Sequence, residues 1–329
     1  MVQFIDVSDA EFVQECQEFL KELRNSNDWI EAKTSGSTGV PKQIRINKNA
    51  AFESAKITNQ HFGLKKDSVF LVCISPKFIG GKMMLVRAEL LGAKVIALPP
   101  AKLNLSLLGG LIVDFAAMVP SQLYNLLQQK EQVNFLNQVK QLIIGGAPVS
   151  ESLRTEIIKL KTECYSTYGM TETISHIALM NLSRKEKFYS CLKGWNISLN
   201  VDGCLIVHKN KVLSKDVLTN DVIELIGENQ FIWKGRNDFV INSGGIKIHP
   251  EEMERKLSKF FDSNEFYFSG ESDNKWGERL VLNVEGEFDP AIESFLLSIF
   301  NDYFDSVHTP KEIRFMPQFH RTPSGKIKR

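Results

Sequence analysis

The segment 34-TSGSTGVPK-42 combines residue types that suit the binding of a phosphate group. Gly36 and Gly39 allow backbone N–H groups to approach an anion closely. The segment also supplies hydroxyl donors and one point charge, at Ser35, Ser37, Thr38 and Lys42. A proline precedes the lysine and the glycines are close together, so this is not a Walker A loop. Taken alone, the composition also fits an ordinary surface turn.

A second candidate is 168-YGMTET-173, which follows an apolar run typical of a buried strand. Tyr168 can stack on a base, and Thr171 can meet a phosphate oxygen. Glu172 can hold Mg²⁺, which prefers oxygen ligands. The sequence therefore predicts a second part of a nucleotide site here.

Three further polar positions fit the same chemistry. Asp221, in 219-TND-221, can hydrogen-bond ribose hydroxyls, as acidic residues do at other nucleotide sites. Arg236 follows a predicted strand, and Lys326 lies in the terminal segment 322-TPSGKIKR-329. Most surface residues of these types are merely solvated, so none of the three is diagnostic by itself.

The helices and strands that must position these residues are predicted to form an α/β fold. A strand of alternating character is predicted at 43–47, and apolar strands are predicted at 69–75, 94–98, 115–119, 141–146 and 163–169. Helices are predicted at 50–62, 82–91, 121–128 and 151–160. Apolar strands alternating with helices predict a mainly parallel sheet covered on both faces. Ligands of such sheets gather at the carboxyl ends of the strands, where the turn 145-GGAP-148 also falls.

The chain changes character after about residue 190. Short strands predict a small antiparallel element, and 235-GRND-238 then interrupts the pattern. We place a domain boundary at Asn237/Asp238, which gives a large domain of residues 1–237 and a small α+β domain of residues 238–329. In the small domain, two strands flank Ser-Gly-Gly and Pro250 opens a helix.

A helix is also predicted near the N-terminus. Ser8 and Glu11 form a capping-box pattern, which places the start of the helix at Ser8. Apolar residues then recur at helical spacing, at Phe12, Val13, Cys16, Phe19, Leu20 and Leu23. We expect this helix to pack on the body of the protein.

Composition limits the possible partners. The chain has 329 residues and a net charge of +1, which argues against nucleic-acid binding. Its five cysteines include no C-x-x-C pair, so a reducing compartment is expected. Without a signal-like start or a long apolar run, the sequence predicts a cytoplasmic protein with no membrane insertion. Whether the chain forms a homo-oligomer stays open.

The order of the motifs is more specific than any one of them. From Thr34 to the C-terminus, the chain carries TSGSTGxPK, GGAP, YGMTE, GRxD, SGGxKIxPxEME and PSGKIKR. In this order they resemble the acyl-adenylate-forming family, which includes acyl- and aryl-CoA ligases, luciferases and adenylation domains. The resemblance implies a large N-terminal domain, a small mobile C-terminal domain, and ATP, Mg²⁺ and CoA as ligands.

The resemblance also implies roles in the large domain. The β- and γ-phosphates of ATP would contact Thr34, Ser35, Gly36, Ser37, Thr38, Gly39 and Lys42. The adenine pocket would be formed by Gly145, Gly146, Ala147, Tyr168 and Gly169. Thr171 would contact the α-phosphate and Glu172 the Mg²⁺, and the ribose would be held by Asp221 and Arg236.

Roles in the small domain follow in the same way. Asp238 would be the hinge about which this domain rotates, and Lys326 would assist adenylation. Ser243, Gly244 and Gly245 would border the tunnel for the CoA thiol. Rotation would then exchange Lys326 and the Ser-Gly-Gly turn at one site.

The chain departs from the family pattern at three places. Only 33 residues precede the phosphate loop, so part of the first subdomain is expected to be missing. The usual T-G-D motif contains Asn220, and Lys77-Phe78 replaces the usual aromatic residue and histidine of the substrate turn.

A finer resemblance, to short bacterial o-succinylbenzoate–CoA ligases of menaquinone biosynthesis, implies a dicarboxylic acid as the small-molecule substrate. The candidates for contacts with it are Lys77, Phe78, Lys82, Arg87, Ser175 and His176. Lys82 and Arg87 could instead face solvent, and His176 could be a core histidine. Another acyl- or aryl-CoA ligase, a carrier-protein loader and a non-catalytic nucleotide-binding relative stay open as alternatives.

Overall fold

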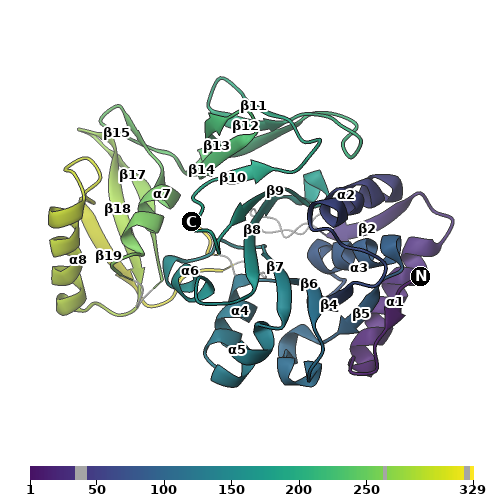
Figure 1. Ribbon diagram of the computed structural model, residues 1–329. Helices are drawn as coiled ribbons and strands as arrows, with labels where there is room; N and C mark the ends of the chain where they lie inside the picture. The colour runs from purple at the N-terminus through teal and green to yellow at the C-terminus, as the bar shows by residue number, and fades with distance from the viewer. Residues whose placement is uncertain (34–42, 262–264, 322–326) are drawn as a thin grey trace.

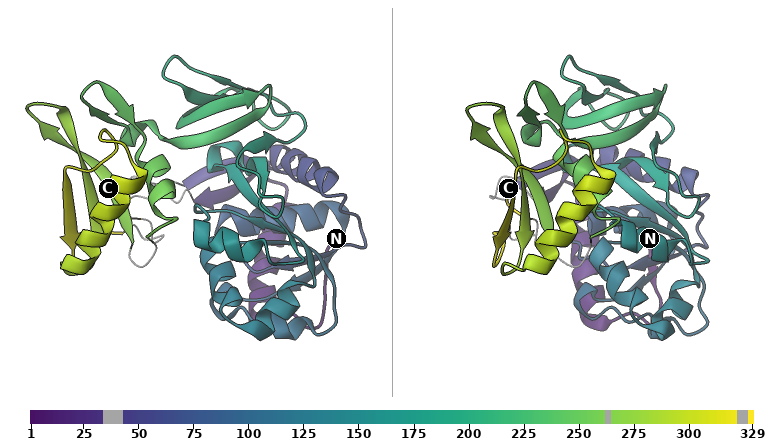
Figure 2. Two further views of the ribbon diagram at one scale, coloured as in Figure 1. Left: turned by 60° about the vertical axis from the view of Figure 1, so that its left-hand side comes forward. Right: turned by 90° about the vertical axis from the view of Figure 1, so that its left-hand side faces the viewer.

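The computed structural model describes residues 1–33, 43–261, 265–321 and 327–329 (Figure 1). Within these residues, one sheet has 12 strands, a second has five, and a third is a two-stranded ribbon. The ribbon pairs β2 (Trp29–Lys33) with β3 (Gln43–Asn47). A large lobe contains the first sheet and a smaller lobe contains the second (Figure 2).

One half of the large sheet is parallel, as predicted. Its strands, in spatial order, are β1 (Gln3–Phe4), β5 (Lys94–Ala97), β4 (Val69–Val72), β6 (Val113–Met118), β7 (Val139–Ile144) and β8 (Glu163–Gly169). Phe70 and Val72 point into one buried cluster and Leu71 into another. Both faces of these strands are therefore covered, which explains their continuous apolar sequences.

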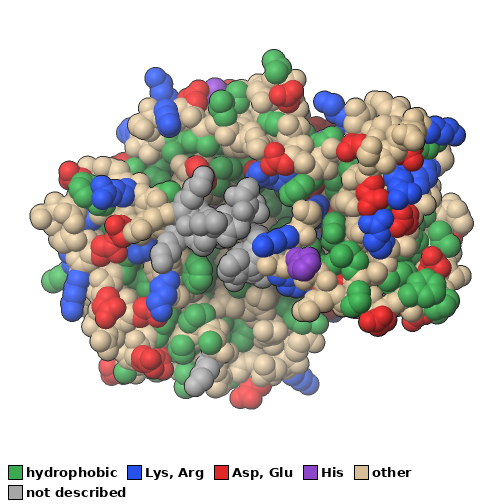
Figure 3. All heavy atoms as spheres, turned by 180° about the vertical axis from the view of Figure 1, so that it is seen from behind, with side chains coloured by type: hydrophobic (Ala, Val, Ile, Leu, Met, Phe, Trp, Pro, Cys, Tyr) green, Lys and Arg blue, Asp and Glu red, His purple; other side chains and the backbone are tan. Residues whose placement is uncertain are grey.

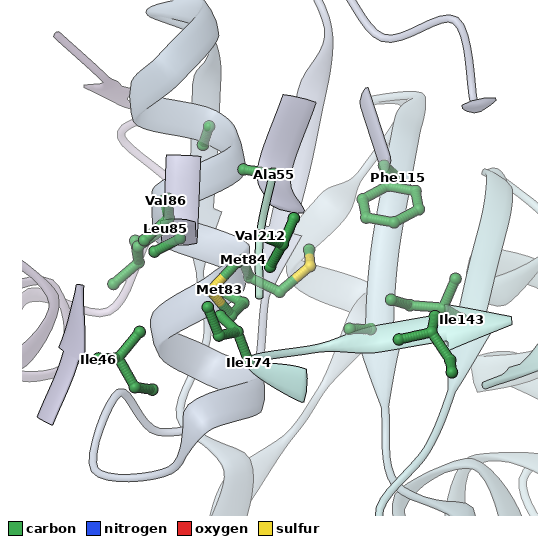
Figure 4. Packing of buried hydrophobic residues seen from close by; sticks show 14 of the residues in the cluster. Ile46, Ala55, Met83, Met84, Leu85, Val86, Phe115, Ile143, Ile174 and Val212 are labelled. Carbon is green, nitrogen blue, oxygen red and sulfur yellow. The ribbon is translucent and has the colours of Figure 1, made fainter. Parts of the chain in front are cut away.

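Helices form the two covering layers. On one face lie α1 (Ala10–Arg24), α2 (Lys48–His61) and α3 (Ile79–Leu91), whose buried side chains form one cluster with strand residues such as Phe115 and Ile143. Figure 4 shows Ala55 of α2 and Met84 of α3 in this cluster. On the other lie α4 (Pro120–Leu127), α5 (Lys130–Leu136) and α6 (Glu151–Ile157) (Figure 1), together with the short helix η2 (Leu105–Leu108). Another short helix, η1 (Pro100–Lys102), follows β5 along the chain.

The other half of the large sheet is antiparallel. It continues from β8 through β9 (His176–Asn181), β10 (Tyr189–Cys191), β14 (Gln230–Arg236), β13 (Val217–Gly227), β12 (Cys204–Val207) and β11 (Ile197–Leu199). The predicted antiparallel element is thus joined to the parallel half. Strand direction changes between β8 and β9, and these two strands are connected by η3 (Thr171–Thr173) and its flanking residues.

The smaller lobe has α+β architecture. Its sheet contains β15 (Ile241–Ser243), β16 (Ile246–Ile248), β17 (Phe266–Asp273), β18 (Gly277–Glu285) and β19 (Glu312–Met316). Its helices are α7 (Pro250–Leu257) and α8 (Pro290–Tyr303). The boundary that we predict at Asn237/Asp238 falls in η4 (Asn237–Phe239), between the end of β14 and the start of β15.

The prediction for the start of α1 is wrong by one residue. Asp9, and not Ser8, caps the helix, since its Oδ1 accepts from the Phe12 N–H at 2.8 Å. Ser8 Oγ instead accepts from the Ala97 N–H at 3.0 Å. Ser8 is therefore used to tie the chain to β5, which a local capping pattern does not reveal.

No helix of the described residues is long and apolar enough to cross a membrane. On the face in Figure 3, acidic and basic side chains of the described residues are interspersed. This distribution agrees with the near-zero net charge of the sequence.

Candidate active site

The connection between β8 and β9 forms the centre of the candidate site. Thr173 is fully buried, and its hydroxyl contacts the backbone of Met170 and the Ser175 carbonyl. These bonds close the turn around η3, which leaves Thr171 half-buried and Glu172 exposed. The turn therefore presents the exposed Glu172 carboxylate at its surface.

The predicted adenine and ribose residues meet beside this turn. Tyr168 Oη donates to Asp221 Oδ2 at 2.6 Å, and the Tyr168 ring packs edge-on against Phe231 at 5.1 Å. Burial and the Asp221 charge raise the pKa of Tyr168 well above its ordinary value, so the phenol stays protonated. Asp221 is 8% exposed, and one of its carboxylate oxygens is already used as the acceptor for Tyr168.

Arg236 lies next to Asp221 because the two residues are partners in the β13–β14 register. Its Nη2 donates to Asp238 Oδ2 at 2.7 Å. Burial opposes the charge of Arg236, but this bond and the nearby Asp221 leave its pKa above the ordinary value. The guanidinium is therefore positioned between the predicted ribose site and the predicted hinge.

Gly145, Gly146 and Ala147 follow β7 at the carboxyl end of the parallel strands. A side chain at Gly145 would collide with Thr167 Oγ1 of β8. Gly169 is equally confined, by the Ser175 carbonyl and the His176 backbone. The residues predicted to line the adenine pocket thus lie at adjacent strand ends, close to the η3 turn.

Arg87 forms the centre of a second polar cluster. It comes from α3, is 1% exposed, and its Nη2 donates to Ser175 Oγ at 2.6 Å. Its Nε has no hydrogen-bond partner among the described residues, and none of their carboxylates lies within ion-pair distance of it. Burial lowers the pKa of Arg87 to about 9, which still leaves it charged at neutral pH. A buried cation with no carboxylate partner among the described residues therefore adjoins the η3 turn.

His176 and α2 complete this cluster. The Thr58 hydroxyl lies 3.2 Å from His176 Nε2, and Asn59 Nδ2 donates to the Arg87 carbonyl at 3.0 Å. Burial, followed by the Arg87 charge, moves the pKa of His176 well below its ordinary value. Asn59 Oδ1 is buried without a partner in the described structure. The cluster therefore combines one cation, a neutral histidine and unsatisfied polar groups.

The remaining acid candidates differ from Arg87. Lys82 is buried, but its Nζ pairs with Glu22 at 3.3 Å and lies 4.2 Å from the Phe19 ring centre. It therefore already has partners in α1. Lys77 is exposed and Phe78 is 58% exposed, at the start of α3.

Two predicted motifs lie outside the described residues: 34–42, which contains the whole phosphate loop, and 322–326, which contains Lys326. The loop connects β2 to β3, whose last register pair is Lys33 with Gln43. After Lys326, Ile327 pairs with Arg321, and Arg329 Nη2 donates to Glu254 at 2.6 Å.

The predicted thiol-tunnel residues form the tight turn between β15 and β16. Gly244 and Gly245 have φ of 61° and 82°, as a two-residue hairpin turn with two left-handed positions requires. The Gly244 N–H donates to the Trp276 carbonyl at 2.7 Å, within the small lobe. The structure therefore does not bring Ser243, Gly244 and Gly245 to the η3 turn.

Comparison with known proteins identifies the family. The sequence profile described as "AMP-binding enzyme" matches residues 34–204, slightly more than half of the chain. The chain belongs to the AMP-binding enzyme family.

Solved and curated relatives agree with this assignment. An acyl-CoA synthetase (AMP-forming)/AMP-acid ligase II-like protein from Dyadobacter fermentans is 32% identical, with a TM-score of 0.65 and coverage of 98% of this chain and 94% of that one. A 2-succinylbenzoate–CoA ligase from Bacillus cytotoxicus is 23% identical, over 90% of this chain and 68% of that protein.

An o-succinylbenzoate CoA synthetase from Bacillus subtilis, solved with its acyl-adenylate intermediate, shares the fold with a TM-score of 0.76. It is 20% identical, over 91% of this chain and 67% of that one.

Glu172 is the residue that the sequence predicts to hold Mg²⁺. The described residues contain no cluster of three potential metal-ligating side chains. Exposed Glu172 nevertheless fits Mg²⁺, which usually binds through one or two carboxylates together with substrate phosphates and water.

Sequence reasoning missed several groups of the candidate site. Thr58 and Asn59 are polar residues inside a helix, a pattern that also fits an exposed face. Ile174 is buried with φ of 67°, a strained conformation for a β-branched residue. The Ser75 hydroxyl donates to Glu15, which connects the substrate turn to α1. Only Thr58 and Asn59 left a signal, since they continue the helical spacing of Ala51 and Ala55 on the buried face of α2.

Proposed function

We propose that this AMP-binding enzyme is an ATP-dependent acid–thiol ligase, and that its acid is o-succinylbenzoate. The observation that carries the choice of acid is Arg87, a buried cation bound to Ser175 and without a carboxylate partner among the described residues. The names of the similar ligases support the same acid.

The reaction has two steps. First, a carboxylate oxygen of the acid bonds to the α-phosphorus of ATP, and the bond from that phosphorus to the bridging oxygen breaks to release pyrophosphate. Second, the CoA sulfur bonds to the acyl carbon, the bond from that carbon to the AMP oxygen breaks, and the thiol proton is lost to water. Mg²⁺ on Glu172 would supply charge neutralisation at the phosphates.

The protein's own residues position the reactants in the first step. Tyr168 would lie against adenine, Asp221 and Arg236 would hold the ribose, and Thr171 would meet the α-phosphate. Residues 34–42 would hold the departing phosphates, and Lys326 would offset the negative charge that develops. Both reactants are anions, so such fixed positive groups are needed for their approach.

The small lobe would rotate about Asp238 between the steps. This rotation would withdraw Lys326 and bring Ser243, Gly244 and Gly245 to the acyl-adenylate, so that the thiol of CoA could enter.

Arg87 explains why a dicarboxylic acid suits the site. An unpaired guanidinium inside a protein is unfavourable, because desolvation is not offset by a counter-charge. The distal carboxylate of the acid could provide this charge, with Ser175 as a further donor. The reacting carboxylate would then point toward Thr171 and Glu172, on the same turn.

Purified protein tests the proposal with Mg-ATP, CoA and o-succinylbenzoate. We expect pyrophosphate release and a CoA thioester of the acid, detected by mass spectrometry. Benzoate, which lacks the second carboxylate, is the matched comparison and should react much more slowly. Faster reaction with monocarboxylic acids would reject the assignment of a dicarboxylic acid as substrate. Transfer of the acyl group only to a carrier protein would reject CoA as the acceptor.

A further inference from the structure

Asp238 is held by donors from two different strands. Asn220 Nδ2, on β13, lies 3.0 Å from its Oδ1 and 3.3 Å from its Oδ2. Arg236 Nη2, at the end of β14, donates to Oδ2 at 2.7 Å. Both donors belong to the large sheet, whereas Asp238 is in η4, where the chain crosses to the small lobe.

Strand geometry directs Asn220 to this position. Its neighbour Thr219 is buried and its hydroxyl donates to the Leu205 carbonyl, on the inner face of the sheet. Since side chains alternate along a strand, Asn220 points outward and is exposed. A glycine at this position, as in the usual T-G-D motif, would have no side chain to reach Asp238.

We propose that Asn220 is a positioning residue that holds Asp238, and with it the small lobe, in the conformation seen here. The inference rests on the proposed two-step function and extends it to a residue with no contact to either reactant. Asn220 acts through Asp238 and is not itself a catalytic residue.

Nucleotide binding should change the hydrogen bonds that position Asp238, because Arg236 is one of their donors. The guanidinium lies between Asp221, its register partner, and Asp238, which accepts from it. A ribose bound by Arg236 would draw hydrogen bonds away from Asp238. Asn220 would then become the main donor to Asp238, so its contribution should be greatest when ATP is bound.

The conformation that Asn220 holds can be related to one half-reaction. Arg329 lies 5.1 Å from the ring centre of Phe239, so the residues that follow Lys326 adjoin the crossing between the lobes. This arrangement corresponds to adenylation, and loss of the hold should therefore slow adenylation alone.

The test compares the variants Asn220→Asp and Asn125→Asp. Asn220→Asp keeps the size of the side chain but replaces the donor to Asp238 with a second negative charge. Asn125 is exposed on α4 and lies outside this network, so its variant controls for added charge. In single-turnover experiments, Asn220→Asp should slow acyl-adenylate formation about 3- to 10-fold, the scale of one or two lost hydrogen bonds. Thioester formation from pre-made acyl-adenylate should be unchanged or faster.

Equal loss in both half-reactions, or no loss in either, would overturn the inference. The double variant Asn220→Ala/Asp238→Asn should be no slower than the slower single variant, because both changes remove one interaction. Additive losses would show that Asn220 does not act through Asp238.

A second measurement does not depend on the identity of the acid. Spin labels at Lys130 on α5 and Ser298 on α8 report the separation of the lobes by pulsed EPR with ATP alone. Asn220→Asp should broaden the distance distribution relative to Asn125→Asp. An unchanged distribution would refute the role of Asn220, even if o-succinylbenzoate proved to be the wrong acid.

Discussion

Arg87 donates to Ser175 Oγ at 2.6 Å from a position where only 1% of Arg87 is exposed. The two residues come from different elements, α3 and the connection that follows η3. Their contact joins the polar cluster around Arg87 to the turn that carries Thr171 and Glu172. Acid recognition and phosphate chemistry would thus be connected through one short segment.

Arg87→Met should lower kcat/KM for o-succinylbenzoate. The loss should correspond to about 2–5 kcal/mol of transition-state stabilisation, as for loss of a buried charge partner. The rate with benzoate should hardly change. Because the variant removes a buried charge that has no carboxylate partner in the described part of the chain, its thermal stability should equal or exceed that of the native protein. Arg184→Met, at a site where the side chain is 74% exposed, is the matched control. Equal losses for both acids would contradict the assignment.

Tyr168→Phe should destabilise the protein by about 1–3 kcal/mol, since it leaves the buried Asp221 carboxylate without its donor. Chemical denaturation measures this change, and calorimetry should show weaker ATP binding. Tyr124→Phe, at a 51% exposed position, should alter neither quantity. Unchanged stability of Tyr168→Phe would mean that the 2.6 Å bond contributes little.

His176 should make the protein less stable in mild acid. Burial holds its pKa well below the ordinary value of 6.5 in the folded state, whereas the unfolded chain regains that value. Below pH 6.5 the unfolded state therefore binds more protons, and stability falls as pH falls, by at most about 1.4 kcal/mol per pH unit for this group. Urea denaturation at several pH values should show a weaker dependence for His176→Gln. An identical slope would exclude His176 as the source, leaving His61 and His249, whose pKa values burial also lowers.

Gly81→Ala and Gly80→Ala should have opposite effects although both lie in the first turn of α3. A methyl group at Gly81 would collide with the carbonyl oxygens of Ile74 and Ser75, at an expected cost of about 1–3 kcal/mol. At Gly80 the same group would lie 3.7 Å from the Ile74 side chain, an ordinary contact. Helix propensity should then stabilise Gly80→Ala by up to about 1 kcal/mol. Thermal unfolding of the two variants checks the prediction.

Lys326→Ala should slow acyl-adenylate formation about 10²- to 10³-fold, the usual effect of removing a preorganised charge. Thioester formation from pre-made acyl-adenylate should be nearly normal, because rotation would have withdrawn the lysine. Rapid-quench measurement of each half-reaction separates the two. A similar loss in both would contradict rotation of the small lobe.

Much of the fold could be predicted because its signals are local. The apolar runs at 69–75 and 141–146 became β4 and β7, with helices on both faces, since a buried parallel strand needs apolar residues throughout. The nucleotide candidates Tyr168 and Asp221 could be named from their motifs, and they do meet.

Long-range partners could not be predicted from the sequence. Whether Arg87 or Lys82 carries a free charge depends on Glu22, which lies 60 residues from Lys82 along the chain. Likewise, Ser8 belongs to a good capping pattern but is used by β5, 89 residues away. Residue types indicate what a side chain can do, whereas only the packing decides which partner it finds.

The β2–β3 ribbon has a practical consequence. The register pair Lys33 and Gln43 fixes both ends of residues 34–42 across neighbouring strands. The entropic cost of joining two fixed chain ends grows only slowly with the length of the connecting segment. Corresponding segments from homologues can therefore be inserted between β2 and β3, and their effect on catalysis can be compared in an otherwise unchanged protein.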